Sequence, residues 1–181
     1  MKLKGFYING YKCLKHFFLP FTEKLVVLVG PNDSGKTAIL EAINYFYKGI
    51  RDGRRIRAME SGKFYMKSVD EIEIAAVFED DMKKINCALT LVINSEESPA
   101  SCEDYRDIVK VSVRKENKIF DEKNIRLKDG ECSLSPNDII QEFLPELIFL
   151  TSDRNLKEAY GATSNIVKPV INEVIGKNHH K

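Results

Sequence analysis

The sequence has no long hydrophobic run and almost no excess of charge of either sign. Nowhere do eighteen consecutive apolar residues occur, so no membrane-spanning helix and no membrane partner are expected. The chain also lacks a charged and then apolar leader with a small-residue cleavage site, which predicts a cytoplasmic protein. A formal net charge of +1 excludes a uniformly basic nucleic-acid clamp, so any DNA binding needs a local patch or a larger assembly.

Cysteine is scarce and is not arranged for metal binding. Cys13, Cys87, Cys102 and Cys132 contain no C-x-x-C pair and no metal-like spacing with the three histidines, so we expect four reduced thiols. With 181 residues, 43% hydrophobic and 30% charged, the chain has the composition of one globular domain. A single lobe spanning residues 1–181 is therefore predicted.

The most informative stretch is Lys24–Gly49, KLVVLVGPNDSGKTAILEAINYFYKG. Its apolar run Leu25–Val29 predicts a strand buried on both faces. Gly30–Thr37 then matches the phosphate-loop pattern G-x-x-x-x-G-K-[ST]. A helix is expected next, ending at Gly49, with one face formed by Ile39, Leu40, Ile43, Phe46 and Tyr47.

The loop residues have expected roles in binding ATP and Mg²⁺. The two glycines let the backbone curl so that successive N–H groups converge on the phosphates. Lys36, the expected catalytic residue, would reach the β- and γ-phosphates, and the Thr37 hydroxyl would ligate Mg²⁺. The predicted nucleotide-binding residues of the loop are Gly30, Asn32, Asp33, Ser34, Gly35, Lys36, Thr37 and Ala38.

A predicted hairpin precedes this loop. Lys2–Tyr11 and Leu14–Phe21 have strand-forming character, with a turn around Asn9–Lys12. Most P-loop kinases and small GTPases begin instead with the phosphate-loop strand. The hairpin therefore indicates a different architecture.

Three phrases together resemble ABC-type ATPases of the RecF, SMC and OLD group: INGYKCL at 8–14, GPNDSGKT at 30–37 and ILEAI at 39–43. Asp33 stands where SMC and RecF proteins usually carry glycine, which is more similar to OLD-family ATP-dependent endonucleases. The resemblance covers about the first fifty residues. It implies an α/β fold, the P-loop NTPase (ABC-ATPase-like) lobe, in which Asn32 orients the phosphate end and Lys12 lies near the base or ribose. It also implies a nucleotide-dependent homodimer that meets DNA through the full assembly.

The segments after the helix are expected to be a basic loop and a β-meander. Residues 48–67 contain seven basic and two acidic side chains, 7 − 2 = +5. Residues 50–68 are therefore either a solvated loop or a loop that contacts a phosphate backbone, with Phe64 and Tyr65 available to stack. An accessory antiparallel meander is predicted over residues 69–130, with strands at Val69–Phe78, Asn86–Ile93, Val109–Arg114 and Lys118–Leu127 and a turn at Lys115–Asn117.

The last segment, residues 131–181, is expected to return to the core. Ser135 caps a short helix through Phe143, Glu146–Thr151 predicts a buried strand, and Thr163–Ile175 predicts a final helix. Asp153 follows that strand as a candidate Mg²⁺ ligand of Walker B type. The next residue is Arg154 rather than the second carboxylate that a Walker B motif needs.

The leading hypothesis is the ATP-binding part of an OLD- or RecF-like ATPase in DNA metabolism or phage defence. ABC-type hydrolysis also needs an LSGG-type signature loop and a Walker B acidic pair, and the sequence contains neither. The chain is thus expected to be an N-terminal fragment of a longer ATPase or a short protein that binds nucleotide alone. Two alternatives stay open: a stand-alone phosphotransferase using Asp153 and Arg154, and a non-hydrolysing module that dimerises with nucleotide.

Overall fold

An antiparallel sheet with one long helix against it forms the part of the chain that the computed structural model describes. That part comprises residues 1–23, 25–51, 56, 58–65, 68–96 and 108–147. The chain divides into two compact units, Met1–Leu147 and Ile148–Lys181. The second unit lies outside the described residues, and with it lie Asp153, Arg154, the expected final helix and most of the expected strand at Glu146–Thr151.

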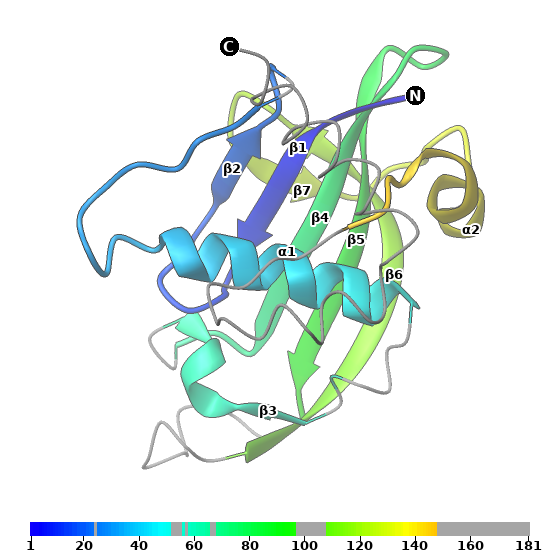
Figure 1. Cartoon of the computed structure of the whole chain (residues 1–181). Helices are drawn as coiled ribbons and strands as arrows, with labels where there is room; N and C mark the ends of the chain where they lie inside the picture. Colours follow the sequence, from blue (N-terminus) through cyan, green and yellow to red (C-terminus); the bar gives the residue numbers. More distant parts are fainter. Residues whose placement is uncertain (24, 52–55, 57, 66–67, 97–107, 148–181) are drawn as a thin grey trace, which may run out of the picture. The chain divides into compact units, whose positions relative to one another are not determined.

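The sheet has seven strands in the order β2-β1-β4-β5-β6-β3, and β7 pairs with β6 (Figure 1). The bounds are β1 Lys2–Asn9, β2 Phe17–Pro20, β3 Ala58–Glu60, β4 Glu71–Asp80, β5 Ile85–Ser95, β6 Ile108–Asp121 and β7 Arg126–Lys128. The expected hairpin is confirmed as the pair β1–β2. It is continuous with the meander, because β1 also pairs with β4 from Lys2 opposite Glu79 to Asn9 opposite Glu73.

The predicted turn at Lys115–Asn117 is wrong. All three residues lie inside β6, which pairs without interruption along β5 from Ser95 opposite Val111 to Cys87 opposite Ile119. The chain turns later, at 122–125, where the carboxylate of Asp121 accepts hydrogen bonds from the backbone N–H groups of Lys123 and Asn124. A long paired strand on β5 therefore outweighs the turn preference of the three polar residues.

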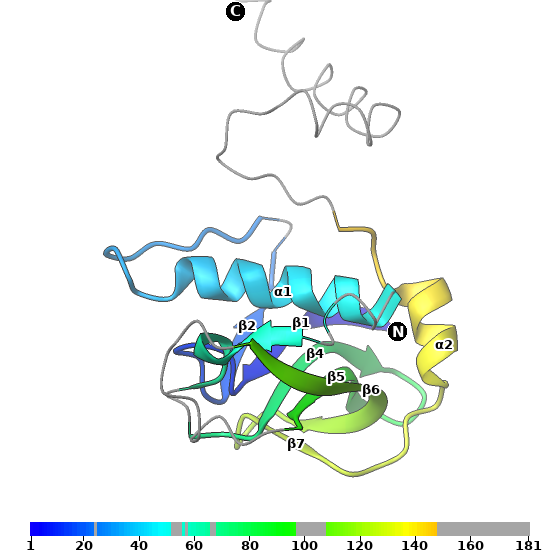
Figure 2. The ribbon, with the colours of Figure 1, turned by 90° about the horizontal axis from the view of Figure 1, so that it is seen from below.

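One helix, α1 (Lys36–Arg51), covers a face of the sheet (Figures 1 and 2). Its buried residues are Ala38, Ile39, Ala42, Ile43, Phe46, Tyr47, Gly49 and Ile50. Leu40 was expected among them but is 47% exposed. Gly49 does not end the helix. A Cβ atom at Gly49 would lie 2.5 Å from Leu91 Cδ2, so the glycine lets α1 approach β5 closely.

The opposite face of the sheet is curled. Phe120 on β6 packs against Phe18 on β2 with ring centroids 4.6 Å apart, although β1, β4 and β5 lie between these strands. Beneath the two rings lie mainly small side chains, Ala75, Val77 and Ala88, together with Tyr7. Small residues at these positions leave room for the sheet to bend over itself.

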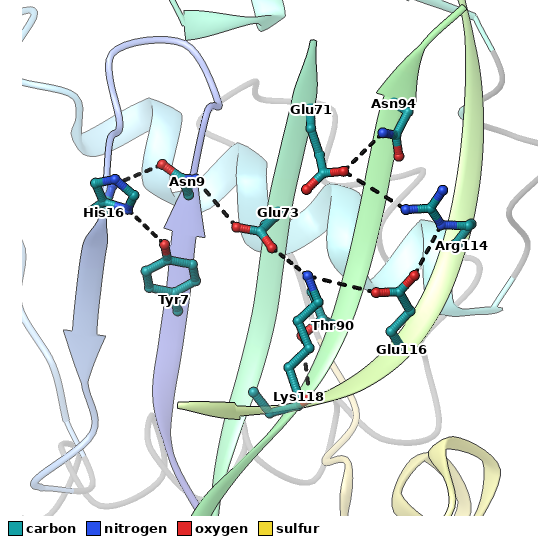
Figure 3. A network of polar contacts seen from close by, with 11 residues as sticks. Tyr7, Asn9, His16, Glu71, Glu73, Thr90, Asn94, Arg114, Glu116 and Lys118 are labelled. Atoms are coloured by element: carbon teal, nitrogen blue, oxygen red, sulfur yellow. Dashed lines mark hydrogen bonds and ion pairs between the residues drawn. The ribbon is translucent and has the colours of Figure 1, made fainter. Parts of the chain in front are cut away.

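A polar network continues along the same curled face (Figure 3). Its centre is the ion pair of Lys118 and Glu73, with Nζ and Oε1 2.8 Å apart and both side chains mostly buried. Burial lowers the pKa of Lys118, but the hydrogen bond and charge of Glu73 outweigh it, so the net pKa is raised. The network spans four strands and pairs the charges on this face. The residues labelled in the figure are Tyr7, Asn9, His16, Glu71, Glu73, Thr90, Asn94, Arg114, Glu116 and Lys118.

The segment after β7 is fastened to the sheet. Cys132 forms a disulfide with Cys87 on β5, so the expectation of four reduced thiols is wrong for this pair. The short helix α2 (Pro136–Asp138) follows, capped by Ser135 as predicted, and continues into the single π-helical turn Ile139–Phe143. Ile139 is fully buried in the main core, which anchors this end of the described chain.

Candidate nucleotide-binding site

The phosphate loop, residues 30–37, is closed into a ring by hydrogen bonds from the Lys36 side chain. The Lys36 ammonium, at the first residue of α1, crosses the loop and donates to the carbonyl oxygens of Gly30 at 2.7 Å and Pro31 at 2.5 Å. It also contacts Ser34 Oγ at 3.1 Å. Asp33 and Gly35 have positive φ angles of 62° and 87°, the left-handed conformation that turns backbone N–H groups toward a common centre. The lysine thus holds the loop in a shape suited to an anion.

A pocket of about 380 Å³ lies at this ring, lined by Cys13 and by every residue from Asn32 to Ala38. Seven of the residues predicted from the motif are therefore brought together, and Gly30 adjoins them through Lys36. Cys13 is the lining residue that the sequence did not indicate. A Cβ atom at Gly35 would lie 3.0 Å from Cys13 Sγ, so the hairpin tip forms one wall. The predicted hairpin before the loop is the feature of the sequence from which the position of Cys13 could have been inferred.

The residues of the pocket fit a Mg²⁺-bound polyphosphate. The ammonium of Lys36, the hydroxyls of Ser34 and Thr37 and the N-terminal end of α1 are donors and positive charge for an anion. Thr37 lines the pocket with a hydroxyl oxygen of the kind that could ligate Mg²⁺ alongside phosphate oxygens. Among the residues that the structure describes, no group of three or more His, Cys, Asp or Glu side chains is placed to hold a metal.

The predicted phosphate-loop strand is absent. Residues 25–29 have no strand conformation, and Leu25, Val27 and Val29 are 77%, 69% and 89% exposed. A strand needs a neighbour to bind its backbone groups, and none of the described strands pairs with this segment. The apolar run is therefore exposed to solvent, and the expected buried strand does not form among the described residues.

Lys12 lies at the hairpin tip, outside the residues that line the pocket. Its ammonium forms an ion pair with Glu41 on α1, and the same carboxylate accepts a hydrogen bond from Tyr11 at 3.2 Å. Lys63 approaches the carboxylate to 3.8 Å. Partial burial raises the pKa of Glu41, but Lys12 and Lys63 outweigh it, so the net pKa is lowered. The resemblance-based position of Lys12 near the base or ribose stays a prediction.

The basic segment 50–68 lies partly outside the described residues, at 52–55, 57 and 66–67. Its described part contains β3 and a 3₁₀ turn, Ser61–Lys63. Phe64 is 1% exposed and belongs to the core, so it is not available to stack on a base. Tyr65 is half-buried and has Lys15 Nζ 5.7 Å from its ring centroid.

A P-loop ring at the start of a helix, beside an antiparallel sheet, defines a nucleotide-binding domain of the P-loop class. The model of the AAA ATPase domain family matches residues 1–179, and the chain belongs to that family. ATPase domains of this kind use ATP, typically with Mg²⁺. No helix in the described ranges is both long and apolar enough to span a bilayer.

A curated relative supports the same class. The chain is 31% identical over 80 residues to the DNA replication and repair protein RecF of Rickettsia canadensis, covering 44% of this chain and 21% of RecF. The chain thus spans about a fifth of the length of that relative. The family model thus shows an ATPase domain, and the similarity to RecF is confined to these 80 residues.

Among solved structures, the chain is similar to one described for ATP-driven dimerization and DNA-stimulated activation of SMC ATPases. The TM-score is 0.39 and the identity 19%, with 69% of this chain and 75% of the other covered.

Proposed function

We propose that this chain is the ATP-binding lobe of an OLD- or RecF-like ATPase that acts in DNA metabolism or phage defence, as part of an ATP-dependent endonuclease. The observation that carries the proposal is the ring in which Lys36 binds the carbonyl oxygens of Gly30 and Pro31. Such a ring presents the loop N–H groups and one cation to a polyphosphate. Asp33 in the third variable position of the motif supports the OLD-like assignment over the RecF and SMC pattern.

In this function the residues of the ring bind and orient the nucleotide. ATP with Mg²⁺ supplies the phosphoanhydride bond that ATPases of this family cleave. Lys36 would balance phosphate charge, the loop N–H groups would bind phosphate oxygens, and the Thr37 hydroxyl would be a ligand for the metal. A signature loop and a Walker B acidic pair are not present in the sequence. Nucleotide binding is therefore the part of the cycle that we assign to these 181 residues.

The proposed partners are a second copy of the chain and, through the assembly, DNA. The exposed apolar residues Leu25, Val27 and Val29 support a larger assembly, because apolar side chains in such a run are usually covered. Light scattering with and without Mg–ATP tests the self-association, with a nucleotide-dependent doubling of mass expected.

Calorimetry of the 181-residue chain with Mg–ATP tests the binding itself. Lys36→Ala is expected to weaken binding by about a hundredfold, because the ring loses both its clamp and its cation. Lys48→Ala, which removes an exposed lysine from the last turns of the same helix, is the matched control and should bind as the wild type does. Equal binding by the wild type and Lys36→Ala, or no binding by the wild type, contradicts the proposal.

A further inference from the structure

Asp33 places a negative charge on the wall of the pocket that the phosphates of a nucleotide would enter. Its side chain is exposed and lines the pocket together with Lys36 and Thr37. Within the described ranges, the carboxylate has no hydrogen-bond or ion-pair partner. The Lys36 ammonium, the cation of the ring, is directed to Gly30, Pro31 and Ser34. No cation of the ring therefore pairs with the Asp33 carboxylate.

The ring of residues 30–37 accordingly has a formal charge of zero, since Lys36 and Asp33 give +1 − 1 = 0. A loop of the same sequence with a neutral residue at 33 would carry +1. A metal-free triphosphate in this pocket would be repelled by the like charge of Asp33, and salt screens charges within one pocket only in part. Mg²⁺ on the nucleotide cancels part of the phosphate charge and so reduces the repulsion.

We propose that Asp33 is a specificity-determining residue that makes the loop select the divalent-metal complex of a nucleoside triphosphate over the free anion. The assignment rests on the proposed function and adds to it the ionic form of the ligand. The selectivity arises because the carboxylate weakens binding of the free anion more than binding of the metal complex, which carries less negative charge.

The backbone at this position allows charge and conformation to be tested separately. Asp33 has a φ of 62°, a left-handed conformation that asparagine tolerates about as well as aspartate and that glycine adopts without strain. Asp33→Asn thus removes the charge while keeping the backbone preference. Asp33→Gly removes the charge and relaxes the backbone as well.

The experiment measures ATP affinity of the full 181-residue chain by calorimetry, once with Mg²⁺ and once with EDTA. Asp33→Asn is expected to tighten binding of metal-free ATP by about tenfold and of Mg–ATP by less than about threefold. The gain in affinity for metal-free ATP should shrink when salt is raised from about 50 mM to about 300 mM.

Asp33→Gly should show at least the same gain in affinity for metal-free ATP. Asp81→Asn, an equal charge change at an exposed turn away from the loop, should bind as the wild type does.

The possible outcomes separate this proposal from the proposed function. Unchanged affinities in Asp33→Asn, or a gain confined to Asp33→Gly, overturn the role of the charge while Lys36-dependent binding remains. Weaker Mg–ATP binding in Asp33→Asn overturns it too, because the carboxylate would then hold the metal. Absence of ATP binding in the wild type overturns both the proposed function and this inference.

Discussion

Lys12 and Glu41 form an ion pair that joins the tip of the N-terminal hairpin to the helix that begins at the phosphate loop. Both side chains are about two-thirds buried, at 29% and 32% exposed. Glu41 also accepts the Tyr11 hydroxyl, so the hairpin meets α1 one turn beyond Thr37. This contact fixes the wall of the pocket that carries Cys13.

A double-mutant cycle over Lys12→Ala and Glu41→Ala measures this pair. We expect a coupling of about 1 kcal/mol in urea unfolding, because the pair is partly desolvated and shares a network. Lys12→Ala alone should change Mg–ATP affinity by less than about threefold, against the hundredfold of Lys36→Ala. A tenfold or larger loss of affinity in Lys12→Ala would show instead that the lysine contacts the nucleotide, in line with the position near the base or ribose that the family resemblance implies.

Local patterns account for what the sequence predicted well. The alternation in β4 and at the start of β6, the hairpin before the loop and the cap at Ser135 each depend on neighbouring residues. The phosphate loop is equally local, since eight consecutive residues contain the glycines, the lysine and the threonine. For these features, spacing along the chain is enough.

The errors concern contacts between distant segments. Lys115–Asn117 looks like a turn until β5 is known to pair along the whole of β6, and Gly49 looks like a helix end until Leu91 is known to lie against it. The run Leu25–Val29 has the composition of a buried strand, but that conformation depends on a neighbour elsewhere. Contacts between segments that are far apart in the sequence cannot be inferred from the spacing of residues along the chain.

The disulfide between Cys87 and Cys132 is a third long-range contact, and it closes a loop with a sequence separation of 45. Cross-linking a loop of this length reduces the entropy of the unfolded chain, which is worth about 4 kcal/mol in the loop-closure model. We expect Cys132→Ser to lower the free energy of unfolding by up to about that amount. Cys13→Ser, which removes the exposed free thiol, should change it little.

Peptide mapping without reductant checks the bond directly. A linked pair of peptides containing Cys87 and Cys132 is expected from protein that is alkylated while unfolded. Alkylation of both cysteines in unreduced protein would show that the bond does not form in solution, and the stability difference between Cys132→Ser and Cys13→Ser should then disappear.

Asp80 holds the same segment to the end of β4. Its side chain is 1% exposed, and its carboxylate accepts from the backbone N–H groups of Met82 at 3.1 Å, Lys83 at 3.4 Å and Ser133 at 3.1 Å. Hydrogen bonding from Ser133 is the largest cause of its lowered pKa, and it outweighs the effect of burial. A buried carboxylate with these donors stabilises the folded state only while it is ionised.

Asp80→Asn should therefore lower the free energy of unfolding by about 2 kcal/mol at neutral pH. Both carboxylate oxygens of Asp80 accept hydrogen bonds from backbone N–H groups, whereas asparagine would place an NH₂ group, itself a donor, against one of these donors. The folded-state pKa lies below the unfolded value, so the contribution of Asp80 is complete above about pH 4 and is lost as pH falls through the folded-state pKa. The stability difference between wild type and Asp80→Asn should shrink accordingly between neutral pH and about pH 3.

Asp81→Asn, the exposed neighbour, is the matched control, and its stability should differ little from that of the wild type at both pH values. Urea unfolding at each pH gives the comparison, and a difference for Asp80→Asn that is the same at both would mean that the ionised carboxylate does not hold this segment.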